Sequence, residues 1–171
     1  MANKPEVWLR GRVDGIPALL QPVGHSLLQC LEEASDLLPS VTTEQLFARP
    51  GGAASIGYHV RHAIGSLDRL FTYARGEKLS AEQMLALKAE GEADPAPDAA
   101  TTLIAAFDAI VHKALAQLRI TDERTLLDVR GVGRAQLPST VLGLLFHAAE
   151  HTQRHMGQMV TTAKIVTHQV L

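Results

Sequence analysis

Four long segments of this chain carry apolar residues at helical spacing, and helix-breaking residues fall between them. They run from Ile16 to Leu38, from Ser55 to Gly76, from about Leu103 to Leu118, and from Pro138 to about Val166. The chain has 171 residues, of which 46% are hydrophobic, so it can build one sizeable core. The sequence therefore predicts an all-α four-helix bundle with a longer crossover connection, formed as a single domain over residues 1–171.

Shorter elements are predicted between these segments. Helical turns are expected to begin near Thr42, in TTEQLFA, and near Ser80, in SAEQMLALK. In LLDVRGVGRAQL, apolar and polar residues alternate around Gly131-Val132-Gly133, which indicates a small hairpin or an irregular crossover. This G-x-G lacks the third glycine of a phosphate-binding loop, and we interpret it as a turn.

Charge and cysteine content narrow the class of protein. With 16 basic and 18 acidic residues, the chain offers no general attraction to nucleic acid or to an anionic membrane. No segment approaches 18 uninterrupted apolar residues, and charges interrupt the N-terminus before any signal-peptide core develops. Cys30 is the single cysteine, which suits a reducing compartment. We predict a cytoplasmic protein that acts on a small molecule or contacts another protein.

Three of the eight histidines lie four residues apart in HAAEHTQRHMGQ, which begins at His147. At about 100° per residue, His151 and His155 lie about 40° and 80° round the helix from His147. His155 thus reaches the apolar face, whereas His151 lies at its border. A buried imidazole must find a partner or stay neutral, and the neutral ring is the form that binds metal ions. From their spacing alone, His151 and His155 fit a pair of metal ligands and a pair of histidines that merely pack equally well.

A metal site needs at least a third protein ligand, and the second segment offers His59 and His62. Ligands from facing helices converge in the core of a bundle, which makes this segment a suitable donor. Helical periodicity places His59 nearer the apolar face and so favours His59. The H-E-x-x-H pattern of zinc proteases is excluded, because alanine and threonine follow the first two histidines of the fourth segment.

Two motifs together resemble a known family. The second segment contains S-I-G-x-x-x-x-H and the fourth contains H-x-x-x-H-x-G-Q; their defined residues are Ser55, Ile56, Gly57 and His62, and His151, His155, Gly157 and Gln158. This pair is similar to the DinB-like (DNA-damage-inducible) superfamily of metal-binding four-helix bundles. The resemblance implies a divalent metal, zinc or nickel with iron or manganese as alternatives, bound by His62, His151 and His155. For the third ligand we follow the motif, which gives His62, and not the periodicity, which favours His59. His59 remains the alternative ligand.

The resemblance also implies a chemistry and an assembly. Three neutral imidazoles leave positions on a metal open for water or substrate, a pattern typical of catalytic sites. The implied activities are a metal-dependent hydrolase and an S-transferase that uses a low-molecular-weight thiol, and the implied assembly is a homodimer. Gln158 is a candidate for orienting a ligand or a bound water. The alternative hypothesis is a non-catalytic helical interaction module whose metal is structural or whose histidines merely pack.

Overall fold

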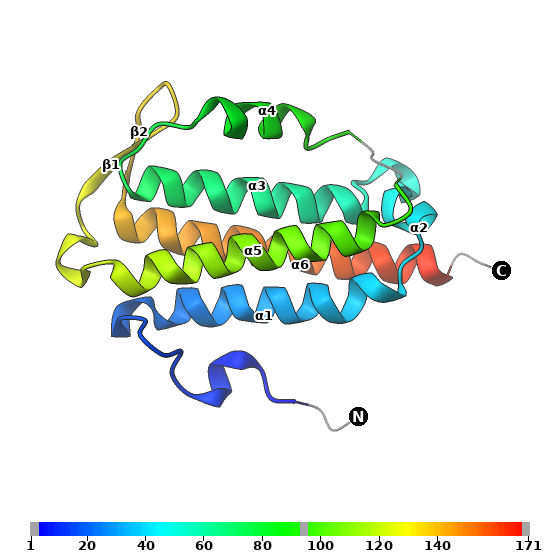
Figure 1. The fold of residues 1–171 in the computed structure, drawn as a ribbon, viewed down its shortest axis with the longest axis horizontal. Helices are drawn as coiled ribbons and strands as arrows, with labels where there is room; N and C mark the ends of the chain where they lie inside the picture. Colours follow the sequence, from blue (N-terminus) through cyan, green and yellow to red (C-terminus); the bar gives the residue numbers. More distant parts are fainter. Residues whose placement is uncertain (1–3, 93–95, 169–171) are drawn as a thin grey trace.

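A four-helix bundle forms the body of the molecule (Figure 1). The computed structural model describes residues 4–92 and 96–168. The bundle helices are α1 (Gln21–Leu37), α3 (Ile56–Ala74), α5 (Ala99–Ile120) and α6 (Val141–His168). Their buried apolar side chains form one cluster, in which Leu27, Leu67, Phe107 and Leu145 are fully buried. The predicted all-α bundle is confirmed, with a small sheet added at one end.

The longer crossover connection follows α3. In Figure 1, α3 and α5 run in the same direction, so the chain must return along the molecule between them. It does so through α4 (Ala81–Ala89), which lies outside α3. Parallel neighbouring helices cannot be joined by a short loop, and this geometry explains the length of the connection.

Local signals explain where several helices begin. The side chain of Ser55 accepts a hydrogen bond from the Tyr58 backbone and caps α3. Thr42 and Ser80 form capping boxes with Gln45 and Gln83, and so start α2 (Thr43–Phe47) and α4. Both short helices were predicted at these positions.

The fourth helix begins later than predicted. Residues around Pro138 belong to strand β2 (Leu137–Thr140), which pairs antiparallel with β1 (Val129–Val132). The two strands form the hairpin that the alternating pattern indicated. Helix α6 starts only at Val141, where the Thr140 hydroxyl accepts a hydrogen bond from the Gly143 backbone. The backbone pairing of β2 thus delays the start of the helix from Pro138, where it was predicted, to Val141.

Among the described residues, α5 alone is long and apolar enough to cross a membrane by length and composition. A core helix of a soluble bundle meets the same criterion. Leu103, Phe107, Val111 and Leu118 of α5 are buried in the common core. This packing places one face of α5 in the common core.

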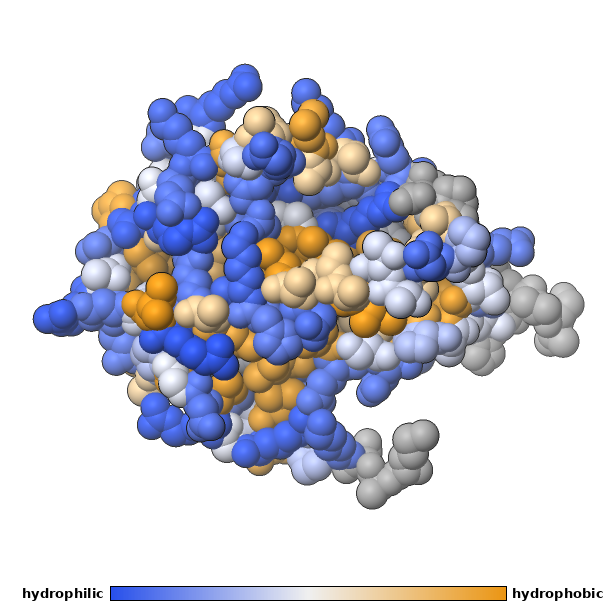
Figure 2. Space-filling view, viewed as in Figure 1, coloured by the Kyte–Doolittle hydropathy of each residue, from blue (hydrophilic) through white to orange (hydrophobic). Residues whose placement is uncertain are grey.

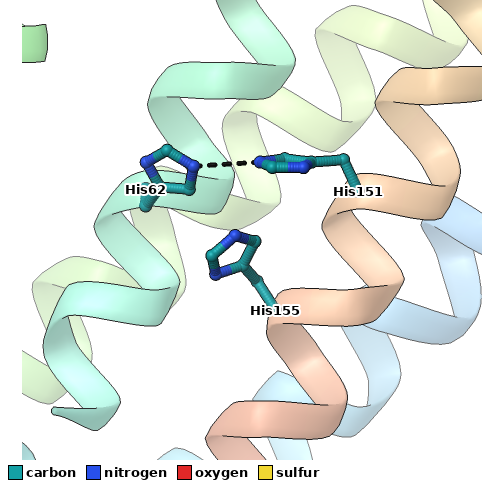
Figure 3. Close-up of side chains that lie close together, drawn as sticks. All are labelled: His62, His151 and His155. Carbon is teal, nitrogen blue, oxygen red and sulfur yellow. Dashed lines mark hydrogen bonds between the residues drawn. The ribbon is translucent and has the colours of Figure 1, made fainter. Parts of the chain in front are cut away.

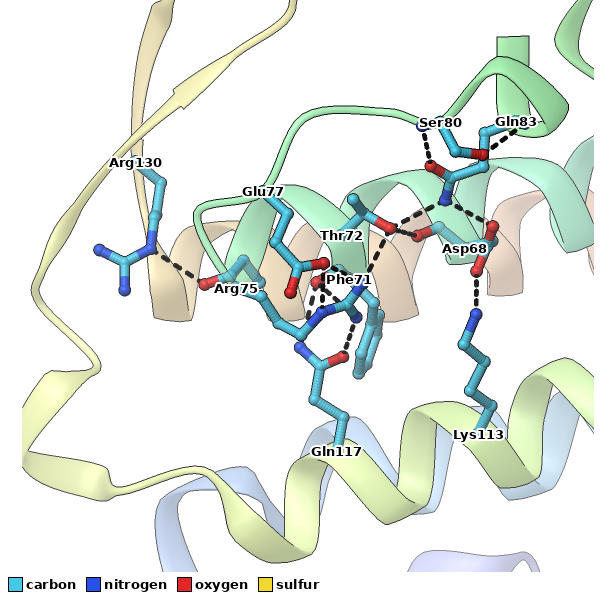
Figure 4. A network of polar contacts seen from close by, with 11 residues as sticks. Asp68, Phe71, Thr72, Arg75, Glu77, Ser80, Gln83, Lys113, Gln117 and Arg130 are labelled. Carbon is cyan, nitrogen blue, oxygen red and sulfur yellow. Dashed lines mark hydrogen bonds and ion pairs between the residues drawn. The ribbon is translucent and has the colours of Figure 1, made fainter.

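Polar contacts fasten α4 to the bundle (Figure 4). No residue between Ala81 and Ala89 is buried, so apolar burial holds this helix only weakly. Instead, the Gln83 amide donates to Asp68 at 2.6 Å and to Thr72 at 2.8 Å, both on α3. Lys113 of α5 contacts the other oxygen of Asp68 at 2.7 Å. Asp68 therefore joins three helices at one point.

Candidate metal centre

Three histidines from two helices converge between α3 and α6 (Figure 3). His62 lies on α3, and His151 and His155 lie one turn apart on α6. One ring nitrogen from each lies within 4.8 Å of the other two, and all three side chains are partly buried. The structure thus brings together the three residues of the motif and could hold a metal ion there.

The glycine of the S-I-G motif has a packing role. A Cβ at Gly57 would lie 2.8 Å from Cε1 of Phe47, a distance too short for two carbon atoms. Phe47 ends the short helix α2 that precedes α3. Gly57 therefore lets α2 pack closely against the first turn of α3, one helical turn before the histidines.

Both ring nitrogens of His62 are engaged. Its Nε2 lies 2.9 Å from Nε2 of His151, and its Nδ1 lies 2.7 Å from Oε2 of Glu90. Glu90 is only 8% exposed, and Arg69 contacts its other oxygen at 2.5 Å. Burial raises the pKa of Glu90, but the hydrogen bonds from His62 and Arg69 outweigh it and leave the pKa below its usual value. A buried carboxylate therefore faces the site from behind His62.

His59 lies beside the three-histidine group, not within it. His59 is buried, with 6% of its surface exposed, and its Nδ1 lies 3.1 Å from Nδ1 of His155. The second ring nitrogen of His155 points toward the space between His62 and His151 (Figure 3). Helical periodicity correctly placed His59 toward the core. The α3 residue whose ring nitrogen meets those of His151 and His155, however, is His62.

His151 carries a buried Nδ1 that has no hydrogen-bond partner within the described parts of the chain. As neutral rings, His62 and His155 can each donate from Nδ1, to Glu90 and His59, which puts their lone pairs on Nε2. Ligands of a tetrahedral zinc at 2.0–2.1 Å lie about 3.4 Å apart, about half an ångström beyond the separation of the His62 and His151 nitrogens. The nitrogens of the whole group lie within 4.8 Å of one another, so the donor set suits a divalent metal once the rings rotate to a common distance from it.

Burial favours the neutral form of His59, His151 and His155. Burial is the largest of the causes that lower the pKa of His155 to about 4, and the positive charges that His62, His151 and His59 could carry contribute to this value. Burial also lowers the pKa of His59 and His151, with His62 as the next cause in both cases. Neutral imidazole is the form that binds a metal ion, so protons compete weakly for His151 and His155 near neutral pH.

Other predicted positions lie away from the three nitrogens. Gln158 is exposed on α6 and its side chain makes no hydrogen bond within the described residues, so its role in orienting a ligand stays a prediction. His147 is half-exposed and contacts Glu150 at 2.7 Å. His112 lies exposed on α5. These two histidines face solvent.

Comparisons with known proteins agree with this architecture. The family model of the DinB superfamily matches residues 26–159. The fold is similar to the crystal structure of a DinB-like protein from Bacillus cereus ATCC 10987, with a TM-score of 0.61 and 16% sequence identity. The match covers 81% of this chain and 89% of that one. No curated protein gives a significant match. Because the family model spans most of the sequence and both histidine motifs, the chain belongs to the DinB superfamily.

Proposed function

We propose that this protein is a divalent-metal-dependent enzyme whose metal is bound by His62, His151 and His155. The observation that carries the proposal is the convergence of three ring nitrogens within 4.8 Å. The 2.7 Å contact of His62 with Glu90 supports it, because histidine ligands of metals commonly donate their other ring proton to a carboxylate. Zinc or nickel suits an all-imidazole set best, with iron or manganese as alternatives.

A metal bound by three neutral imidazoles keeps its full charge and its open positions, and can there lower the pKa of a water or a thiol. Hydrolysis and thiol transfer are both available to such a site. A thiol cosubstrate with carboxylates would need free arginines nearby. Arg69 is paired with Glu90 at 2.5 Å and Arg154 with Glu150 at 2.6 Å, and Arg61 donates to the backbone oxygen of Glu92. We therefore rank metal-dependent hydrolysis first and thiol S-transfer second.

A cavity lies on the Glu90 side of His62, and the three converging histidines are not among the residues that line it. It has a volume of about 560 Å³ and lies between α3, α4 and α5, with Arg61, Ile64, Ala86, Glu90 and Leu103 among its walls. Glu90 connects the cavity to His62. Apolar walls with a few polar groups are typical of small-molecule pockets. The cytoplasmic location and the homodimer stay predictions.

Metal analysis tests the proposal most directly. Protein purified without an affinity tag is expected to carry about one divalent metal per chain, and a chelator should lower its melting temperature. Ligand binding to the folded state alone adds about 2.7 kcal/mol of stability when free metal is 100 times its Kd. Elemental analysis and thermal melting measure the two effects. A chain that carries no metal and melts identically with chelator would instead support the non-catalytic interaction module.

Turnover assays separate the two chemistries. We expect the zinc- or nickel-loaded protein to hydrolyse simple esters or amides, and to lose this activity with chelator. The matched assay replaces water as acceptor with a low-molecular-weight thiol and an electrophilic substrate. Thiol consumption without hydrolysis would reverse our ranking, while turnover in neither assay would favour a binding role.

A further inference from the structure

We propose that Glu90 is a positioning residue that holds His62 in the tautomer with its proton on Nδ1. The inference rests on the proposed function, since the tautomer matters because His62 is to bind a metal. An ionised carboxylate has only acceptor oxygens, so the 2.7 Å contact between Nδ1 and Oε2 requires the proton to lie on Nδ1. The lone pair of His62 then lies on Nε2, which faces His151.

Arg69 and Gly65 hold Glu90 in this position. Arg69 contacts Oε1 at 2.5 Å, which leaves Oε2 for His62. Gly65 lies on the same face of α3, and a Cβ there would collide with Oε1 of Glu90 and lie 2.7 Å from a terminal nitrogen of Arg69. Glycine inside a helix costs about 1 kcal/mol relative to alanine. The close approach of the carboxylate gives this glycine a structural reason.

The crossover helix delivers the carboxylate. Glu90 is the residue that directly follows α4, and α4 is fastened at its other end by the contacts of Gln83 with Asp68 and Thr72. Since no residue of α4 itself is buried, these polar contacts hold its first turn, while Arg69 and His62 hold Glu90 directly at its other end. The crossover connection thus contributes to the histidine site, although it supplies none of the three converging nitrogens.

Glu90→Gln tests the role through metal affinity. A glutamine amide has only one acceptor oxygen. Because Arg69 can only donate, it would take this oxygen, and the NH2 group would then face His62 and favour the tautomer with its proton on Nε2. Competition titration with Zn²⁺ is expected to show affinity about 10- to 100-fold lower than in the parent protein, the usual loss for such outer partners. Glu92→Gln is the matched control, because it removes an exposed carboxylate two residues away. Unchanged affinity in Glu90→Gln would overturn the proposal.

Gly65→Ala moves the carboxylate without removing any charge. It should weaken Zn²⁺ binding as Glu90→Gln does, while destabilising the metal-free fold less, because the added methyl group favours helix. In the opposite outcome, the loss of Zn²⁺ affinity in Gly65→Ala and Glu90→Gln would only mirror their loss of stability without metal. Glu90 would then have a structural role alone.

The tautomer can be read directly from the metal-free protein. Two-bond proton–nitrogen correlations, recorded above the usual pKa of histidine, should show the His62 proton on Nδ1 in the parent and partly on Nε2 in Glu90→Gln. A parent ring protonated on Nε2 refutes the inference whether or not the site binds metal. A parent that binds no Zn²⁺ but has the expected tautomer refutes the proposed function alone.

Discussion

His151→Ala and His155→Ala are each expected to abolish stoichiometric metal binding while the helical bundle stays folded. Either change removes one of three converging nitrogens, and two imidazoles cannot complete the site. The loss of metal affinity should exceed the 10- to 100-fold effect that is typical when a hydrogen-bond partner of a ligand is removed. Titration with Zn²⁺ measures the affinity, and circular dichroism confirms the helix content. His112→Ala, on the exposed face of α5, is the matched control and should bind metal normally.

His62→Ala and His59→Ala divide the two candidates on α3. The His62 variant should behave like the two α6 variants, because its Nε2 lies beside His151. The His59 variant should lose only the partner of the His155 Nδ1, so its affinity should fall about 10- to 100-fold at most. Complete loss of binding in His59→Ala with normal binding in His62→Ala would assign the ligand to His59.

The bundle could be predicted from the sequence because each long helix buries one regular apolar stripe. Local caps at Thr42, Ser55 and Ser80 likewise act within one turn, so their positions follow from neighbouring residues. The start of α6 was misplaced because strand pairing between Val129 and Thr140 joins residues on either side of a turn. Such pairing competes with a helix signal and is not visible in helical periodicity.

The site was only partly predictable, because some of its contacts join residues that lie far apart in the sequence. The four-residue spacing of His151 and His155 places both on one face of one helix. The choice between His59 and His62 depends on how α3 is rotated against α6, which a helical wheel does not contain. Glu90 was missed because it contacts a histidine 28 positions away, from the end of a short helix with no buried face. One available signal was Gly65, a glycine within a helix that otherwise favours larger residues.

The metal-free protein is expected to lose stability in acid, between the ordinary histidine pKa of 6.5 and the value of about 4 for His155. Burial makes the folded state release this proton more readily than the unfolded state does. Within that range the unfolded chain therefore binds more protons, so its free energy falls relative to the fold as the pH decreases. His59 and His151 have pKa values lowered in the same direction and add to the effect.

His155→Gln isolates the contribution of one ring. It removes the titrating group but keeps a polar side chain, so its melting temperature should fall less than that of the parent as the pH drops through this window. The parent saturated with Zn²⁺ should resist acid further, because metal and protons compete for the same nitrogens. Melting curves of the chelated and loaded forms at several pH values measure both differences. Parallel pH profiles for the parent and His155→Gln would show that His155 does not titrate differently on folding, and that burial at this site is weaker than the packing of α3 against α6 implies.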